Sequence, residues 1–250
     1  MKLKDKTVLL TGASGGIGLE LSDLLKKAGA NVKTVGRKDG NDYVADLSDP
    51  IQLSSLCQKI ARDDIDIIIN SAGLQYFGFT HEQDPQSVSN ILKTNVEAPI
   101  RLIQALIPNM LKKGSGHIVN IGSVFGYIPF PHFSVYSATK AAMGAFSQSI
   151  RREYADKGIK VTHISPRAVK TNMNSGPIIE LLKETKSQID SPEKVAKKII
   201  KAIEADKKSI TIGFPEKLFV KISMIAPSII DNALAKNIKI AEDILKKHKA

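Results

Sequence analysis

Hydrophobic positions along the chain fall into two alternating kinds of segment. Short runs of consecutive apolar residues, typical of buried strands, are separated by longer segments whose apolar residues recur at helical spacing. The expected strands are residues 7–10, 32–35, 43–45, 66–70, 117–121, 161–164 and 209–212. The expected helices are residues 17–28, 51–60, 87–107, 136–156 and 191–204. This alternation predicts an α/β fold, a doubly wound parallel sheet of about seven strands with helices on both faces.

The pattern changes after residue 171. We expect residues 172–190, with their own apolar cluster, to form a mobile helical lid over a substrate. Residues 1–213 are predicted to form one catalytic domain, and residues 214–250 a helical extension that is not an independent domain. The extension is apolar first and lysine-rich later, so a helix pair packed on the body or on another subunit is the first interpretation. Peripheral contact with a membrane, lysines at the lipid headgroups, is the alternative.

The first strand runs directly into a glycine-rich turn, TGASGGIG at 11–18, and a helix follows. In this context the glycines let a pyrophosphate approach the backbone, and the new helix offers free N–H groups. After the second strand come Gly36, Arg37 and Lys38, where an acidic residue would bind the ribose 2′-hydroxyl of NAD. A guanidinium suits a 2′-phosphate instead, so Arg37 favours NADP over NAD. A ribose contact from Asp39, or a purely solvated Arg37, are the alternatives.

Tyr136 and Lys140 begin an apolar-periodic run and lie on one face of the predicted helix. An ammonium near the phenol favours the phenolate, so we expect Lys140 to lower the pKa of Tyr136. The phenol would then exchange a proton with a substrate oxygen, which Ser123 would also hydrogen-bond. An ordinary surface tyrosine is the alternative for this pattern taken alone. Further along the sheet, Asp46 is expected either to accept from an adenine amino group or to cap a helix.

Composition narrows the class of protein. The single cysteine, Cys57, allows no internal disulfide and suits a reducing compartment, so a cytoplasmic location is expected. Neither a signal peptide nor an apolar run long enough to span a membrane is evident. The net charge of +11 comes largely from lysines scattered on helix faces, without the aromatic residues of a nucleic-acid surface. The five histidines lack metal-ligand spacing, although His132 is expected near the candidate site.

These motifs together resemble the short-chain dehydrogenase/reductase family, in the branch with TGxxxGxG and YxxxK. The resemblance rests on TGASGGIG at 11–18, NSAG at 70–73, Asn95, Ser123, YSATK at 136–140, and Pro166 with Thr171. It implies a Rossmann-like oxidoreductase that transfers hydride between NADP(H) and a ketone, aldehyde or secondary alcohol, and that forms a homodimer or homotetramer. The tail from about residue 192 is similar to that of members acting on lipid-like substrates.

The resemblance also implies roles for individual residues. Tyr136 is the general acid/base, Lys140 lowers its pKa and binds the nicotinamide ribose, Ser123 positions the substrate, and Asn95 supports a water in a proton relay. The residues implied to contact the cofactor, besides Arg37, Tyr136 and Lys140, are Gly12, Ser14, Gly16, Ile17, Gly18, Asp46, Leu47, Asn70, Ala72, Gly73, Pro166, Val169 and Thr171.

The chain departs from the family pattern at three places: Ser71 replaces an asparagine, Arg167 replaces a glycine, and the segment after Arg37 is short. None of these changes touches the implied catalytic residues. A non-catalytic NADP-binding sensor, or a membrane-associated scaffold on the same fold, is the alternative function.

Overall fold

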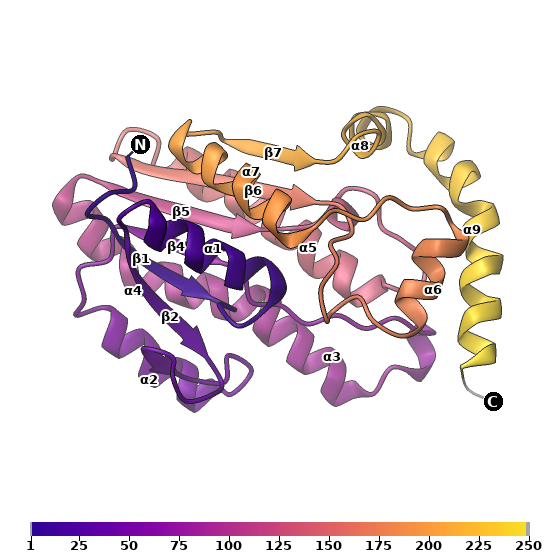
Figure 1. The fold of residues 1–250 in the computed structure, drawn as a ribbon, viewed down its shortest axis with the longest axis horizontal. Helices are drawn as coiled ribbons and strands as arrows, with labels where there is room; N and C mark the ends of the chain where they lie inside the picture. The colour runs from indigo at the N-terminus through magenta and orange to yellow at the C-terminus, as the bar shows by residue number, and fades with distance from the viewer. Residues whose placement is uncertain (1, 249–250) are drawn as a thin grey trace.

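The centre of the molecule is a seven-stranded parallel sheet (Figure 1). The computed structural model describes residues 2–248. The strands follow the order β3-β2-β1-β4-β5-β6-β7, with the order reversing between β1 and β4. Their bounds are β1 Thr7–Thr11, β2 Asn31–Gly36, β3 Tyr43–Val44, β4 Ile67–Asn70, β5 Gly116–Ile121, β6 Ile159–Pro166 and β7 Ser209–Ile212. The predicted doubly wound Rossmann-like sheet is therefore confirmed.

Helices cover both faces of this sheet. Their bounds are α1 Gly16–Lys27, α2 Pro50–Ile60, α3 Pro85–Leu92, α4 Ala98–Lys113, α5 Ser134–Glu153, α6 Pro177–Glu184, α7 Pro192–Glu204, α8 Glu216–Ile225 and α9 Pro227–Lys247. Short 3₁₀ turns lie at Thr80–Glu82 and Val124–Gly126. Side chains fix several helix starts: Asp49 accepts hydrogen bonds from the first turn of α2, and Ser191 accepts one from Lys194 at the start of α7.

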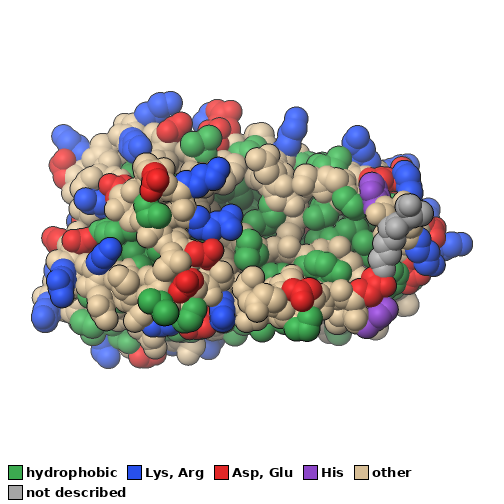
Figure 2. Space-filling view, turned by 90° about the horizontal axis from the view of Figure 1, so that it is seen from below, with side chains coloured by type: hydrophobic (Ala, Val, Ile, Leu, Met, Phe, Trp, Pro, Cys, Tyr) green, Lys and Arg blue, Asp and Glu red, His purple; other side chains and the backbone are tan. Residues whose placement is uncertain are grey.

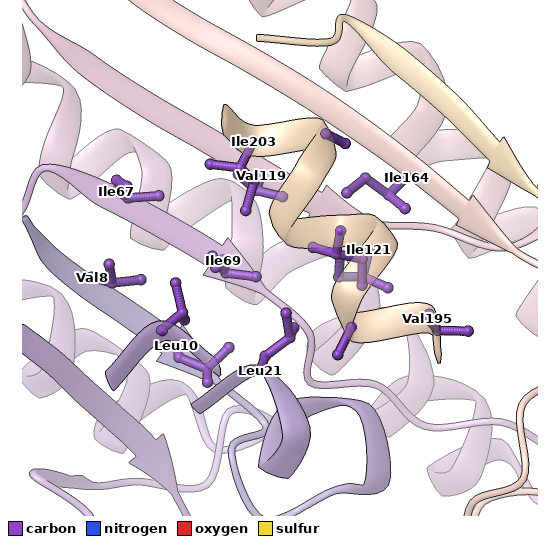
Figure 3. Packing of buried hydrophobic residues seen from close by; sticks show 14 of the residues in the cluster. Val8, Leu10, Leu21, Ile67, Ile69, Val119, Ile121, Ile164, Val195 and Ile203 are labelled. Carbon is purple, nitrogen blue, oxygen red and sulfur yellow. The ribbon is translucent and has the colours of Figure 1, made fainter. Parts of the chain in front are cut away.

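Two apolar cores lie on opposite faces of the sheet. In the first, shown in Figure 3, side chains of β1, β4, β5 and β6 meet Leu21 of α1 and Val195 and Ile203 of α7. In the second, the alternate strand residues meet α2, α4 and α5, for example through Leu53, Leu102 and Ile150. Because strands buried on both faces must be apolar at every position, their continuous hydrophobic runs follow from this layering.

The helix predicted at 87–107 differs from the structure. Helical backbone runs from Pro85 to Lys113, and the segment Lys93–Glu97 inside it is a π-helix. A π-helical turn inserts an extra residue and re-aims the side chains around it. Asn95 lies in this turn, and its buried amide bonds to residues outside the helix, so tertiary contacts rather than local propensity account for the difference.

The strands point toward one end of the molecule, where α6, α8 and α9 lie (Figure 1). The end of α9 is tied to α6, because Glu180 accepts hydrogen bonds of 2.8 Å from both Lys247 and His248. The helix pair expected in the extension is thus present. Across residues 2–248, none of the helices combines the length and apolarity that a membrane crossing requires.

Candidate active site

A cavity of about 620 Å³ lies at the carboxyl end of the sheet. Its inner part is bordered by the glycine-rich turn and the starts of α1 and α5, and its outer part by the loop 124–133, α6 and the extension. Figure 2 shows hydrophobic side chains gathered around a hollow on one face of the molecule, between the sheet-bearing body and its C-terminal end. In open α/β sheets, ligands bind at this end, where the strand order reverses.

The glycine-rich turn forms a cradle that larger residues would fill. Gly12 adopts φ 71°, and a Cβ there would lie 2.8 Å from the Cα of Ala72. A Cβ on Gly16 would lie 2.6 Å from the Cγ2 of Thr171, and one on Gly18 would overlap the carbonyl oxygen of Gly12. The unbonded N–H groups of the first turn of α1 face an anion placed here. These features fit the pyrophosphate of a dinucleotide.

Tyr136 and Lys140 lie one above the other in α5, as predicted, and both line the cavity. The Nζ atom of Lys140 is 5.5 Å from the centre of the Tyr136 ring and donates a 3.0 Å hydrogen bond to the carbonyl oxygen of Ile121. Ser123 follows β5, and its hydroxyl hydrogen-bonds the Tyr136 phenol and accepts a bond from the backbone of Phe125. Three residues of the implied catalytic set thus converge.

The pKa values of this pair differ from the expectation. Burial raises the pKa of Tyr136 to about 12, although the hydrogen bond with Ser123 acts in the opposite sense. Burial also lowers the pKa of Lys140 to about 8. The expected lowering of the Tyr136 pKa by Lys140 is therefore not found. Burial destabilises the phenolate by more free energy than its polar neighbours supply to stabilise it.

Asn95 is buried beside the cavity rather than in its wall. Its Oδ1 accepts a 2.8 Å hydrogen bond from the backbone of Leu74, and its Nδ2 donates to the carbonyl of Leu74 and to Thr139. Thr139 in turn donates to the carbonyl of Tyr136. The amide therefore joins the segment after β4 to the start of α5. The water relay implied for Asn95 stays a prediction.

The cavity brings together most of the predicted cofactor residues on the pyrophosphate and nicotinamide sides. Those in its wall are Gly12, Gly16, Ile17, Gly18, Gly73, Tyr136, Lys140, Pro166, Val169 and Thr171. Ser14, Arg37, Asp46, Leu47, Asn70 and Ala72 are not among its lining residues.

The residues outside the cavity have other surroundings. Arg37 is exposed immediately after β2, and Leu47 is buried in the second core. The Asp46 carboxylate accepts bonds from the backbone and hydroxyl of Ser48, and Asn70 donates to the Asn120 amide of β5. Their contacts with cofactor stay predictions. His132 does not line the cavity: its ring packs edge-on against Phe79, 4.9 Å between centroids.

An aromatic and aliphatic wall, which the sequence analysis did not assign, closes the outer part of the cavity. The Phe125 and Phe130 rings stack with 5.3 Å between centroids, and Phe133 packs at an angle against both, at 5.2 and 6.1 Å. Phe125 and Phe133 pack edge-on against Tyr136 at 6.4 and 6.5 Å. The aromatic-rich run FGYIPFPHF at 125–133, shortly before Tyr136, is the sequence feature that could have predicted this wall. Leu234 of α9 also lines the cavity, and no local pattern indicates that, because its position depends on how the extension folds back.

Arg167, at the end of β6, is a hub of polar contacts in the cavity wall. Its guanidinium bonds both carboxylate oxygens of Asp190, at 2.9 and 3.1 Å, and also Gln188, the Phe214 carbonyl and Glu216. The side chains of Arg167 and Asp190 are only 9% and 1% exposed. Arg167 therefore joins the sheet, the end of the predicted lid and the start of α8.

Comparisons with known proteins agree with this geometry. Residues 6–177 match the family described as short chain dehydrogenase. The chain is 36% identical over 190 residues to an uncharacterized oxidoreductase of Staphylococcus epidermidis, which covers 70% of this chain and 83% of that protein.

Solved structures show the same relationship. A short-chain dehydrogenase from Sphingobium yanoikuyae in complex with NADPH aligns with a TM-score of 0.77 and 25% identity, over 92% of this chain and 95% of that one. A bulky-bulky ketone specific alcohol dehydrogenase from Comamonas testosteroni aligns with a TM-score of 0.75 and 25% identity, over 90% and 94%. The chain belongs to the short-chain dehydrogenase/reductase family and is an oxidoreductase acting on CH–OH or C=O groups.

Proposed function

We propose that this protein is an NADP(H)-dependent oxidoreductase that interconverts an apolar ketone or aldehyde and its alcohol, with Tyr136 as general acid/base. This proposal rests mainly on the Tyr136 phenol, which is buried and hydrogen-bonded to Ser123. The phenol lies in an aromatic wall of the same cavity that the glycine-rich turn borders. A carbonyl oxygen placed beside Ser123 and Tyr136 receives two hydrogen bonds, and its carbon faces the cofactor side of the cavity.

The chain's own groups supply orientation and a proton. The bound nicotinamide supplies the hydride chemistry. Because the pKa of Tyr136 is about 12, its phenol is protonated at neutral pH and can donate to the oxygen of a carbonyl that is being reduced. The Lys140 ammonium, 5.5 Å from the centre of the Tyr136 ring, would hold the nicotinamide ribose of a bound cofactor. Asn95 fixes the turn of α5 that carries both residues.

NADP is the proposed cofactor because Arg37 directly follows β2, and the residues at that strand end would hold the adenosine ribose of a bound dinucleotide. Because β1 and β2 are parallel neighbours, their carboxyl ends lie at the same edge of the sheet. The exposed guanidinium of Arg37, directly after Gly36, is therefore available to a 2′-phosphate. The relative from Sphingobium yanoikuyae, solved with NADPH, supports the same choice.

The apolar substrate is proposed from the wall of Phe125, Phe130, Phe133 and Leu181, and the bulky-ketone specificity of the Comamonas testosteroni relative supports it. We place catalysis in residues 1–213, with the lid at 172–190 and the extension at 214–250 as a wall of the same site. A homodimer or homotetramer and a cytoplasmic location, peripheral to a membrane through residues 214–250, complete the proposal.

Replacing Tyr136 by Phe tests the function. The change removes one oxygen from a buried ring, so we expect the fold and NADPH binding to persist while NADPH consumption with apolar ketones falls at least about a hundredfold. Titration of both proteins with NADPH and NADH, followed by fluorescence, measures cofactor binding and choice. Retained turnover in Tyr136→Phe would refute the assigned role, and tighter binding of NADH than NADPH would refute the role of Arg37.

A non-catalytic NADP-binding sensor is the second candidate. It predicts NADPH binding by the wild-type chain without turnover of any carbonyl compound. The intact arrangement of Ser123, Tyr136 and Lys140 favours the enzyme, since cofactor sensing alone does not need a phenol bonded to a serine in the cavity.

A further inference from the structure

The outward side of α8 and its flanks is an apolar surface in contact with solvent. Its residues, hereafter the α8 outer face, are Phe214, Leu218, Ile225 and Ile229. Ile225 is 86% exposed and Phe214 is 76% exposed. Large apolar residues grouped in this way, unlike scattered ones, mark an interaction surface.

The opposite side of α8 is firmly packed, so the outward side is not simply a helix waiting to dock on its own chain. Val220 is buried with Ile128 and Ile230, and Ser223 donates a 2.9 Å hydrogen bond to the carbonyl of Tyr127. Leu218 and Ile225 lie two helical turns apart, on the side away from Val220. The body therefore holds α8 in a fixed orientation with an apolar face turned outward.

The charges around the α8 outer face indicate which kind of partner it binds. Lys217 and Lys221 are exposed beside it, and the sequence contains no acidic residue between Glu216 and Asp231. A second copy of the chain, joined through a two-fold axis, would bring the lysines of both copies together. A surface with an apolar interior and anionic headgroups complements both features, because leucine and isoleucine enter the acyl region and lysines meet the headgroups.

We propose that the α8 outer face docks on an anionic lipid bilayer and that the substrate reaches the cavity from that bilayer. The second part rests on the proposed function. Pro215, Glu216 and Phe219, in or directly before the same helix, line the cavity, and Phe219 as a whole residue is also 43% exposed. One helix thus forms both the docking face and a wall of the substrate site. When the protein is docked, this apolar wall lies next to the bilayer in which the substrate is dissolved.

Co-sedimentation with vesicles tests the docking. We expect the full-length protein to bind vesicles of phosphatidylcholine mixed with phosphatidylserine, and to bind phosphatidylcholine alone more weakly. The partition coefficient of Leu218→Ser/Ile225→Ser into mixed vesicles should be lower by about tenfold or more, since two apolar side chains are no longer transferred from water into the lipid. Lys217→Gln/Lys221→Gln should lose about fivefold per lysine, and added salt should reduce wild-type binding in the same direction.

Two matched variants serve as controls. Ile51→Ser removes an exposed apolar residue of α2, and Lys197→Gln/Lys198→Gln removes two lysines of α7. Both should leave vesicle binding unchanged. Equal losses from the α7 and α8 lysine variants would overturn the proposal in favour of a general effect of the basic surface. Absence of vesicle binding by the wild type would also overturn it, as would dimers that disappear in Leu218→Ser/Ile225→Ser, which would indicate a second copy as the occupant.

Turnover separates this proposal from the proposed function. With a short, water-soluble ketone and no vesicles, wild type and the α8 variants should consume NADPH at equal rates. With a water-insoluble ketone carried in mixed vesicles, Leu218→Ser/Ile225→Ser should be slower than wild type by about the factor lost in partition. Equal rates on the vesicle-borne ketone would overturn delivery from the bilayer, whereas absence of turnover in every assay would refute the oxidoreductase proposal alone.

Discussion

At the residue scale, burial acts on Tyr136 and Lys140 in the same physical sense, since it disfavours the charged form of each. The phenol is therefore protonated throughout the neutral range, whereas the ammonium, with a pKa of about 8, begins to lose its proton slightly above neutrality. The pair offers two protons at neutral pH and only the phenolic one in mild alkali. A protonated phenol of this kind can serve as the acid when a carbonyl is reduced.

The rate of ketone reduction should therefore depend on pH through Lys140. Because its lowered pKa is about 8, Lys140 is charged below that value, and kcat/KM for reduction should fall as pH rises through about 8. A pH profile of NADPH consumption measures this. NADPH affinity determined over the same range is the control, since Lys140 is also expected to bind the nicotinamide ribose. A profile that stays flat well into alkali, with unchanged affinity, would contradict the assignment.

At the scale of elements, the contact of α1 with the turn before it depends on Gly18. A Cβ at this position would overlap the carbonyl oxygen of Gly12, which is backbone and cannot rotate aside. We expect Gly18→Ala to lower the free energy of unfolding by about 1–3 kcal/mol and to weaken NADPH binding, since α1 must shift away from the turn.

Gly144 supplies the matched control, because it is a glycine of α5 whose added Cβ would lie 3.6 Å from the Nε2 of His163, an ordinary contact. Gly144→Ala should leave NADPH binding unchanged and raise stability by up to about 1 kcal/mol, because alanine loses less backbone entropy in a helix. Denaturant unfolding and NADPH titration of both variants measure the difference. Equal effects of the two changes would show that the Gly12 contact is unimportant.

Local patterns predicted the elements whose cause is local. The apolar runs at 66–70 and 117–121 became β4 and β5, and Ser191 with Pro192 began α7 as expected. The π-helix around Asn95 was not predicted, because the Asn95 side chain makes three hydrogen bonds with Leu74 and Thr139, which are far away in the sequence. The pKa of Tyr136 was predicted in the wrong direction for a related reason: spacing shows that Lys140 is near but does not show how deeply both are buried.

At the scale of the whole molecule, the Arg167 hub is a single clasp between parts that the chain visits far apart. Arg167 directly follows β6, Asp190 ends the segment 172–190, and Glu216 begins α8. Glu180 accepts hydrogen bonds from Lys247 and His248, and these join α6 to the end of α9. The segment 172–190 is thus joined to the sheet and to the start of α8 through Asp190, and to the end of α9 through Glu180.

Replacing Arg167 by Met should loosen this clasp. Asp190 would stay buried with only Lys194 as its cationic partner, and an uncompensated buried carboxylate costs about 3 kcal/mol or more. We expect Arg167→Met to lower the free energy of unfolding by about 3 kcal/mol and Arg167→Met/Asp190→Asn to recover part of that loss. Lys197→Met, which breaks an exposed pair with Glu193, should change stability by less than about 1 kcal/mol.

The effect of pH distinguishes the loss of an ion pair from a loss of packing. Burial alone would raise the pKa of Asp190, but hydrogen bonds from Arg167 and Lys194 outweigh it and hold that pKa below its ordinary value. A lowered carboxyl pKa gives stability that is present above about pH 4 and is lost as pH falls through the lowered pKa. The stability gap between wild type and Arg167→Met, measured by denaturant unfolding, should therefore narrow in acid. A gap that is the same at neutral and acid pH would mean that Arg167 acts through its packing, and the clasp would then not be electrostatic.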